Sequence, residues 1–553
     1  MGGSVRGQLE TVLDLKHMPC IEKLLLSGNE AVASAALDAG ITLGTGYPGT
    51  PSTEILEHFD QLGGHAQWAP NEKVALEVAI GVAIAGGRSL ATMKHVGLNV
   101  AADPFFTVAY MDVKGALVVV SADDPGMASS QNEQDNRHYA RAAGVAMFEP
   151  SDSQEAYDFT LQAIAASERW HAPVLLRLTT RVCHSKTLVQ RAAKNSVPPP
   201  LPLHWKPDLK TQVMIPAYAR PAHHRLRAKL AEMAEWNEQH GPNQIIDGPA
   251  DLGIITSGIS YQHVREAAPE ARVLKLGMTY PLPIEMMRRF AQGVKRCLVV
   301  EEGDPFLVEN ARMAGITVED KPSMYRFGEL NVPRVRRILA NDTSPEPAPV
   351  PGKPPELCPG CPHRTAFSAL KDLDTIVSGD IGCYTLGVLP PFEALHISVC
   401  MGASIGVALG LRHTLPPEEA KRVVSVIGDS TFVHTGIPGI VEMVYNPPPT
   451  GHVVMILDNG ITAMTGLQEN PSTGRALNHS HTGKIVLEEL VRSLGVPNVH
   501  VIDGVTDPKG LERLLEDAIA KPELSVIINR RTCLLATKLI KEYERCYELQ
   551  PSH

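Results

Sequence analysis

The segment Val423–Gly466 constrains the fold of this chain more than any other stretch. Two short apolar runs, too β-branched to be helices, flank a helical stretch, and the three are Val423–Ile427, Gly436–Tyr445 and Val453–Leu457. The pattern predicts a strand–helix–strand unit with parallel strands, whose carboxyl ends open on one edge of the sheet. Asp429 and Asn459, which follow the two strands, are therefore expected to converge. A carboxylate and an amide oxygen, with a nearby backbone carbonyl, suit a hard cation such as Mg²⁺.

This Gly-Asp and Asn spacing resembles the diphosphate–magnesium motif of enzymes that use thiamine diphosphate. Such a cofactor is activated by a carboxylate that bonds its aminopyrimidine ring, so the resemblance implies a glutamate on a second domain. Glu72 fits because Asn71 is a suitable helix N-cap and an Ala/Gly-rich helix follows. Glu77 on the same helix is the alternative. A glutamate in a first helical turn also serves simply to offset the helix dipole.

The rest of the chain predicts an α/β protein with parallel sheets. Residues 22–190 alternate expected strands at Ile41–Gly44, Leu90–Met93, Ala116–Ser121 and Val174–Leu178 with expected helices at Asn29–Ala39, Glu72–Ala85 and Ser153–Ser167. A length of 553 residues suggests about three domains. The boundaries follow composition: a first domain at 20–195, a connector with a polar helix near 221–238 at 196–247, a second domain at 248–340, a proline-rich linker at 341–356 and a last domain at 357–553.

Bulk properties exclude several classes of protein. A net charge of −10 argues against nucleic acid or an anionic membrane as the main partner. We find no apolar run of the roughly 18 residues that span a bilayer, and the N-terminus lacks the apolar core of a signal peptide. We therefore expect a cytoplasmic protein, in which cysteines are thiols or metal ligands and not a disulfide framework.

Four cysteines form the second strong signal. Cys358 and Cys361 are a C-x-x-C pair, Cys383 lies in a Gly-Cys turn, and Cys533 follows a strand-like run. Four thiolates are the ligands of a [4Fe–4S] cluster, but they also suit a structural Zn²⁺, and reduced unligated thiols are a third reading. The spacing leaves these alternatives open. The other cysteines read as ordinary thiols, although Cys400 could line a cofactor.

His95 and its neighbour Lys94 follow an expected strand, at an edge that could face a cofactor. Histidines in such loops are more often structural, and substrate or proton handling is the alternative for His95. The loop that begins at Asp123-Asp124 is rich in turn formers and reads as a connection between a strand and a helix.

A long series of motifs resembles the 2-oxoacid:ferredoxin oxidoreductase family, and within it the large (alpha) subunits of the indolepyruvate branch. The matching stretches extend over roughly residues 20–535, and they are TGYPGTPSTEI (Thr45–Ile55), NEKVALEVAIG (Asn71–Gly81), KHVGLNVAADP (Lys94–Pro104), DDPGMASSQNEQDNRHYA (Asp123–Ala140), EPSDSQEA (Glu149–Ala156), CPGCPHR (Cys358–Arg364), GDIGCYTLG (Gly379–Gly387) and CMGASIG (Cys400–Gly406). The resemblance implies two thiamine-diphosphate-binding, doubly wound parallel-sheet domains that flank a smaller domain like the C-terminal domain of transketolase. The first domain would bind the pyrimidine ring and the last the diphosphate.

The resemblance also implies roles for particular residues. It places Thr50 at the substrate and makes the main-chain carbonyl of Ile461 the third Mg²⁺ ligand beside Asp429 and Asn459. It favours the [4Fe–4S] reading of the four cysteines. Met464 stands where relatives acting on small oxoacids carry a polar side chain, which suggests a bulkier substrate. The remaining cofactor contacts are expected from the turns and backbone amides of Gly382, Gly402, Gly428 and Ser430.

The implied function is oxidative decarboxylation of an aryl- or otherwise bulky 2-oxoacid to its acyl-CoA. A non-oxidative decarboxylase or carboligase (a lyase) and a non-catalytic subunit are the alternatives. The sequence contains no C-x-x-C-x-x-C-x-x-x-C run of the kind found in the ferredoxin-like domain common in these large subunits, so electrons are expected to leave through another chain, to ferredoxin or a flavin. A small beta (gamma-like) subunit is expected as a partner, and a site at a domain interface suggests an (αβ)₂ or larger assembly.

Overall fold

The computed structural model describes residues 20–192, 197–200, 203, 206–348 and 352–548. The chain divides into two compact units, Met1–Pro347 and Ala348–His553, and the division falls within the predicted proline-rich linker. None of the helices in these described ranges is long and apolar enough to cross a membrane.

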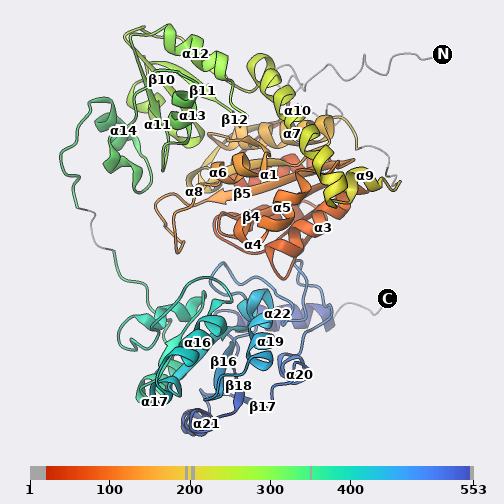
Figure 1. The fold of residues 1–553 in the computed structure, drawn as a ribbon, viewed down its shortest axis with the longest axis vertical. Coiled ribbons are helices and arrows are strands. Elements are labelled where there is room, and N and C mark those ends of the chain that lie inside the picture. The colour runs from red at the N-terminus through yellow and green to blue at the C-terminus, as the bar shows by residue number, and fades with distance from the viewer. Residues whose placement is uncertain (1–19, 193–196, 201–202, 204–205, 349–351, 549–553) are drawn as a thin grey trace. The chain divides into compact units, whose positions relative to one another are not determined.

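The first unit is built on a seven-stranded sheet with the order β12-β6-β7-β5-β4-β2-β3 (Figure 1). All neighbouring strands are parallel except β12, which pairs antiparallel with β6. The strands are β2 Leu43–Gly46, β3 Ala66–Trp68, β4 Arg88–Lys94, β5 Ala116–Asp123, β6 Ala146–Phe148, β7 Val174–Thr179 and β12 Met278–Tyr280. Central strands such as β5 and β7 are buried along their whole length, which explains their continuous apolar sequence.

Several helices of the first unit begin at a capping side chain. Asp152 caps α7 by accepting a hydrogen bond of 2.9 Å from the Glu155 amide, and His171 ends it in a left-handed conformation. The predicted helices are confirmed as α1, α3 and α7. The helices in this part of the unit are α1 Gly28–Asp38, α2 Thr53–Gln61, α3 Glu72–Ile84, α4 Gly97–Val100, α5 Ala102–Val108, α6 Arg137–Ala143, α7 Ser153–Trp170 and α8 Thr180–His184. A two-stranded antiparallel sheet, β1 Cys20–Ser27 with β8 Lys186–Ala192, lies beside them.

Much of the stretch predicted as a connector is built into the core of this unit. The polar helix expected near 221–238 is the longer α10, Pro216–His240, and α9 Leu209–Gln212 precedes it. Leu226, Leu230 and Met233 recur on one face of α10 and join the core of the first sheet. Trp236 packs edge-on against Trp170, with ring centroids 5.5 Å apart. The apolar stripe was present in the sequence, but the surrounding prolines and charges obscured it.

The remaining part of the first unit carries a four-stranded sheet, β13-β10-β11-β9. The strands β10 Leu252–Ser257, β11 Arg272–Leu276 and β13 Arg296–Val300 are parallel, and β9 Gln244–Ile246 is antiparallel to β11. The helices here are α11 Gly258–Ala267, α12 Ile284–Gln292, α13 Phe306–Met313, a 3₁₀ turn at Ser323–Arg326 and α14 Val332–Leu339. Strand β12 leaves this region to join the first sheet, and buried Arg137 pairs with Glu301 at 2.6 Å, so the two sheets belong to one unit.

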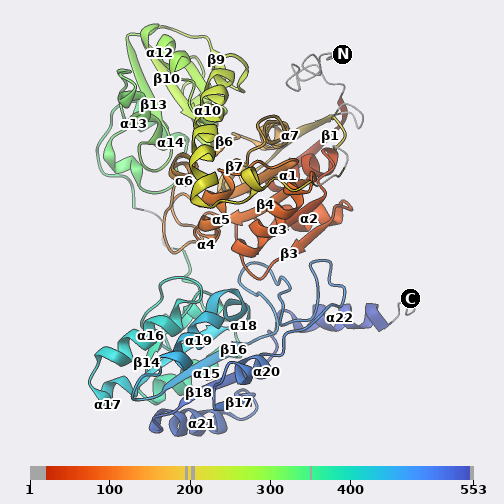
Figure 2. The ribbon, with the colours of Figure 1, turned by 45° about the vertical axis from the view of Figure 1, so that its right-hand side comes forward.

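The second unit is a five-stranded, wholly parallel sheet with the order β14-β15-β16-β18-β17 (Figure 2). Its strands are β14 Ile376–Ser378, β15 Val423–Gly428, β16 His452–Asp458, β17 Asn498–Ile502 and β18 Leu524–Arg530. Two separate apolar cores cover its faces, one with α15 His363–Asp372 and α21 Pro508–Ala520, the other with α16 Ala403–Thr414, α19 Ile437–Tyr445 and α20 Leu487–Ser493. Helices on both faces confirm the α/β class predicted for this region. The remaining elements are a 3₁₀ helix at Cys383–Val388, α17 Pro417–Ala420, α18 Asp429–Thr431, a π-helical turn at Phe432–Gly436 and α22 Thr537–Glu548.

Candidate active site

Three predicted site residues of the first unit follow neighbouring strands at the same edge of the sheet. Thr50 lies in the loop after β2, Glu72 begins the helix after β3, and His95 directly follows β4. The strands β4, β2 and β3 are adjacent and parallel, so their carboxyl ends face one edge. This is the edge at which parallel sheets bind ligands. The structure thus gathers the three residues, while their chemical roles stay predictions.

Glu72 is buried, and its alternative is exposed. The Asn71 side chain accepts a hydrogen bond of 3.0 Å from the Val74 amide, which confirms the predicted cap and fixes Glu72 as the first residue of α3. Glu72 is 5% exposed, and a Cβ atom on Gly97 would lie only 2.5 Å from its Oε1 atom. Gly97 therefore permits this close approach. Glu77 lies on the outer face of α3 in an ion pair with Lys73, so Glu72 is the better candidate.

His95 is completely buried beneath the loop that follows β5. Its Nε2 atom lies 3.2 Å from the carbonyl oxygen of Asn132, and Nδ1 has no hydrogen-bond partner among the described residues. Burial lowers the pKa of His95 more strongly than the nearby Asp123 raises it, so the imidazole is neutral near pH 7. The carbonyl at Nε2 favours the tautomer with its proton there, which leaves Nδ1 as an unused acceptor.

In the second unit the two halves of the Asp/Asn motif meet as predicted. Strands β15 and β16 are parallel neighbours. Asp429 follows β15, and its Oδ2 atom accepts a hydrogen bond of 3.0 Å from the amide of Gly460, one residue after Asn459. The Oδ1 atom of Asn459 accepts a hydrogen bond of 3.1 Å from the Ile461 amide. The Asp429 carboxylate is therefore bonded directly to the Asn459–Ile461 turn.

The electrostatics of Asp429 fit a cation site. Its carboxyl group is 2% exposed, and burial, followed by the negative charge of Asp458, raises its pKa to about 8. Asp429 forms no ion pair within the ranges that the structure describes. A divalent cation bound here would favour the ionised form and offset the burial. The donor set of carboxylate, amide and carbonyl oxygens suits Mg²⁺.

The backbone amides expected to meet the diphosphate are already engaged inside the unit. Gly382 donates to the Thr385 hydroxyl at 3.1 Å, Gly402 donates to Asp380 at 2.8 Å, and Ser430 donates to Asp429 at 2.8 Å. Each of these amides has a partner within the unit, as buried N–H groups do, and an approach of these turns to a diphosphate stays a prediction. Gly428 borders the ring of Tyr384, since a Cβ atom there would lie 2.8 Å from Cε1.

Asp380 holds loops of the second unit together, and the sequence analysis did not single it out. It is completely buried and accepts hydrogen bonds from the amides of Ile381, Gly402 and Ser404 at 2.8–3.1 Å. It therefore ties the loop after β14 to the left-handed turn that begins α16. The available signal was a second Gly-Asp pair after an apolar run, Gly379-Asp380, which repeats the pattern of Gly428-Asp429.

The four predicted cluster cysteines share one region of the second unit. The amide of Cys361 donates to the carbonyl of Cys358 at 3.0 Å, and the turn between them borders Leu534, the neighbour of Cys533. Burial contributes most to the raised pKa of Cys383, and the charges of the other three cysteines raise it further, to about 11. Still, no three His, Cys, Asp or Glu side chains of the described residues are placed to hold a metal ion. The structure brings these thiols near one another without deciding among cluster, zinc and free thiols.

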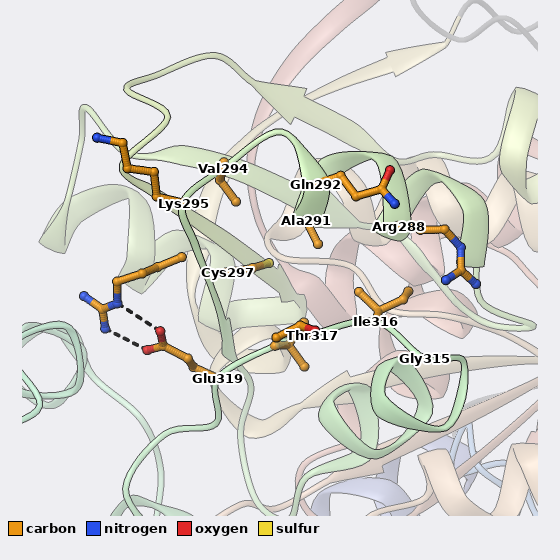
Figure 3. A pocket seen from close by; sticks show the side chains of 12 residues that line it. Arg288, Ala291, Gln292, Val294, Lys295, Cys297, Gly315, Ile316, Thr317 and Glu319 are labelled. Carbon is orange, nitrogen blue, oxygen red and sulfur yellow. Dashed lines mark hydrogen bonds and ion pairs between the residues drawn. The ribbon is translucent and has the colours of Figure 1, made fainter.

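Met464 and a cavity at the second sheet of the first unit lie apart from the groups described so far. Met464 is 51% exposed in the loop after β16. A cavity of about 400 Å³ lies at the amino end of β13, with Cys297 among its lining residues (Figure 3). Its cations are paired, Arg296 with Glu319 and Lys295 with Asp251. Because the cavity lies at the amino end of β13, it is at the end of its sheet opposite the ligand-binding edge, and we assign no function to it.

Comparisons with known proteins agree with this geometry. Residues 34–242 match the family described as pyruvate flavodoxin/ferredoxin oxidoreductase, thiamine diP-bdg. Residues 380–528 match the thiamine pyrophosphate enzyme, C-terminal TPP binding domain. Indolepyruvate oxidoreductase subunit IorA of Archaeoglobus fulgidus is 39% identical over 550 residues, which cover 93% of this chain and 87% of that protein.

Two relatives from Methanothermobacter thermautotrophicus mark how far the likeness extends. Its indolepyruvate oxidoreductase subunit IorA is 37% identical over 97% of this chain and 90% of its own length. Its ketoisovalerate oxidoreductase subunit VorB is 25% identical over 52% of this chain and 89% of its own length. The likeness to the first kind of subunit thus spans both structural units.

Proposed function

Because this chain belongs to the indolepyruvate oxidoreductase large-subunit family of thiamine-diphosphate-dependent 2-oxoacid oxidoreductases, we propose that it oxidatively decarboxylates an aryl- or otherwise bulky 2-oxoacid to acyl-CoA and CO₂. The observation that carries this proposal is the hydrogen bond between Asp429 and Gly460, which joins both halves of the diphosphate motif. The exposed Met464 in the following loop supports a bulky substrate side chain.

Thiamine diphosphate, when bound, supplies a carbanion nucleophile and an electron sink for the loss of CO₂. Glu72 would hold a hydrogen bond to its aminopyrimidine ring, and the burial of this carboxylate strengthens such a bond. Asp429, Asn459 and the carbonyl of Ile461 would hold Mg²⁺. Thr50, at the same edge as Glu72, would contact the substrate. His95, neutral and buried, would act on the substrate or on a proton only after the loop above it moves.

The four cysteines Cys358, Cys361, Cys383 and Cys533 would bind a [4Fe–4S] cluster that takes electrons singly from the reaction. Their position supports this assignment. Cys533 donates its amide to the carbonyl of Asn459 at 3.0 Å, so the proposed cluster lies beside the proposed magnesium loop. Electrons would leave to ferredoxin or a flavin on another chain. Coenzyme A would capture the acyl group.

The proposed architecture has three domains, at 20–195, 248–340 and 357–553. Residues 196–247, expected to be a connector, add α10 to the core of the first domain, and the linker at 341–356 precedes the third. The first would bind the pyrimidine ring, the second is like the C-terminal domain of transketolase, and the third would bind the diphosphate. Matches to thiamine-diphosphate domains at 34–242 and 380–528 support the first and third assignments. The assembly would contain a small beta (gamma-like) subunit in at least an (αβ)₂ arrangement.

The test is an anaerobic survey of 2-oxoacids with a viologen dye, using the chain copurified with its small subunit. We expect arylpyruvates to reduce the dye in a reaction that needs coenzyme A, thiamine diphosphate and Mg²⁺. Iron and sulfide are measured in the same preparation. A colourless, iron-free sample that still decarboxylates 2-oxoacids would replace this proposal with the lyase. A complex that fails to bind thiamine diphosphate with Mg²⁺ in calorimetry would point to a non-catalytic subunit.

A further inference from the structure

Lys94 differs from the other cations at the ligand-binding edge of the first sheet. Most of these cations form ion pairs: Lys73 with Glu77, Arg137 with Asp135 and Glu301, Arg177 with Asp123 and Glu149, and Arg181 with Glu329. Lys94, the last residue of β4, has no carboxylate within ion-pair distance in the described ranges. Its ammonium donates to the carbonyl oxygen of Ser129 at 2.6 Å.

The surroundings of Lys94 make an unpaired charge unfavourable. The side chain is only partly exposed, and burial lowers its pKa more than the nearby Asp124 raises it. Asp124 itself is held by the amide of Ser129 and the hydroxyls of Ser130 and Thr180. A partly desolvated ammonium with a single carbonyl partner retains capacity for an anion.

The stem of Lys94 lies against the loop that carries Thr50. A Cβ atom on Gly49 would be 3.0 Å from the Cβ of Lys94 and 3.8 Å from its Cδ, so the side chain runs along the backbone just before Thr50. The glycine at position 49 leaves room for this stem. The ammonium is thereby placed at the same edge as Thr50 and Glu72, which follow the adjacent strands β2 and β3.

We infer that Lys94 binds the carboxylate of the 2-oxoacid substrate. This inference rests on the proposed function, in which every substrate carries a carboxylate next to its keto group. An ammonium in a partly desolvated site forms charge-assisted hydrogen bonds with a carboxylate, and these are stronger than neutral ones. Lys73, Arg137, Arg177 and Arg181 are held by protein carboxylates, whereas Lys94 is available to bind the negative charge of the substrate.

The test compares an anionic ligand with a neutral ligand of the same shape. Binding of indole-3-propanoate and of its amide is measured by calorimetry with the complete complex loaded with thiamine diphosphate and Mg²⁺. For the wild-type complex we expect the anion to bind about tenfold or more tightly than the amide. In Lys94→Met the anion and the amide should bind about equally tightly, and the affinity for the amide should be the same as in the wild type. Lys94→Arg should restore part of the preference, because it restores the charge.

The matched control is Lys295→Met, which removes an exposed lysine at the amino end of β13, in the other sheet of this unit, and should leave the preference unchanged. Unchanged amide binding also shows that Lys94→Met is folded. The inference is overturned if the wild-type complex does not prefer the anion, if Lys94→Met keeps the preference, or if both ligands weaken equally, which would indicate that Lys94 only supports the Ser129 loop. Failure of the proposed function is a separate result, namely no dye reduction by the wild-type complex with any 2-oxoacid.

Discussion

The backbone amide of Cys533 donates a hydrogen bond of 3.0 Å to the carbonyl oxygen of Asn459. These residues follow β18 and β16, which are parallel neighbours, so the bond joins the loops at the carboxyl ends of two strands. One loop carries a proposed cluster ligand and the other a proposed magnesium ligand. In the proposed mechanism, electron transfer between cofactor and cluster needs such proximity, and the backbone at one sheet edge would provide it.

Replacing Glu72 with glutamine should lower turnover by about 10²- to 10⁴-fold, because the amide keeps the shape of the side chain but loses the basic carboxylate. Thiamine diphosphate binding, measured by calorimetry, should change little. The matched control is Glu77→Gln on the exposed face of the same helix, which should retain activity. Near-normal turnover of Glu72→Gln would remove Glu72 from the proposed mechanism.

The contribution of Asp429 to the stability of the metal-free protein should fall as the pH rises from about 4 to about 8. Its folded-state pKa lies above the usual value, so the folded state holds a proton that the unfolded state releases over this range. Asp429→Asn should flatten this part of the stability profile and abolish Mg²⁺-dependent cofactor binding. The measurement is thermal unfolding across pH, with and without Mg²⁺. Asp503→Asn, at an exposed ion pair, is the control. A stability profile of Asp429→Asn identical to that of the wild type would contradict the prediction.

Asp380→Ala should destabilise the protein by roughly 2–4 kcal/mol, since three backbone amides would lose one shared acceptor in a buried place. Urea unfolding followed by circular dichroism measures the change. Affinity for thiamine diphosphate should also fall, because the turn at Gly402 is held by the same carboxylate. A loss of stability equal to that of Asp507→Ala, an exposed helix cap, would show that Asp380 has no special structural role.

Cys383→Ala should remove the broad visible absorption of an iron–sulfur cluster and lower the iron content of the anaerobically purified complex. Cys297→Ala is the control, because this thiol is buried in the first unit and outside the proposed ligand set. The two variants are compared by absorption spectroscopy and by iron and sulfide analysis. An unchanged spectrum in Cys383→Ala would show that the ligand set is wrong. Bound zinc in place of iron would favour a structural Zn²⁺ site.

Patterns within short stretches allowed much of this fold to be predicted. The apolar runs around Asp429 and Asn459 predicted two parallel strands, and the structure confirms both the strands and the meeting of their loops. The cap at Asn71 was likewise readable, because N-cap geometry depends on three or four consecutive residues. The alternation of strands and helices was enough to predict the α/β class.

Interactions between distant residues were not readable in the same way. Nothing in residues 278–280 indicates that they form the antiparallel edge strand β12 of a sheet built from residues 43–179. The role of Asp380 also depends on residues distant in the sequence, and so does the absence of an ion-pair partner for Lys94 within the described residues.

The sequence by itself determined the main strands and helices of both units and which chemical groups follow them, because side-chain periodicity and capping act over a few residues. Only the tertiary structure decided which of those groups are buried, which amides are already satisfied and which charges are paired. Those properties depend on side chains that approach from other strands, and a linear pattern does not contain their distances.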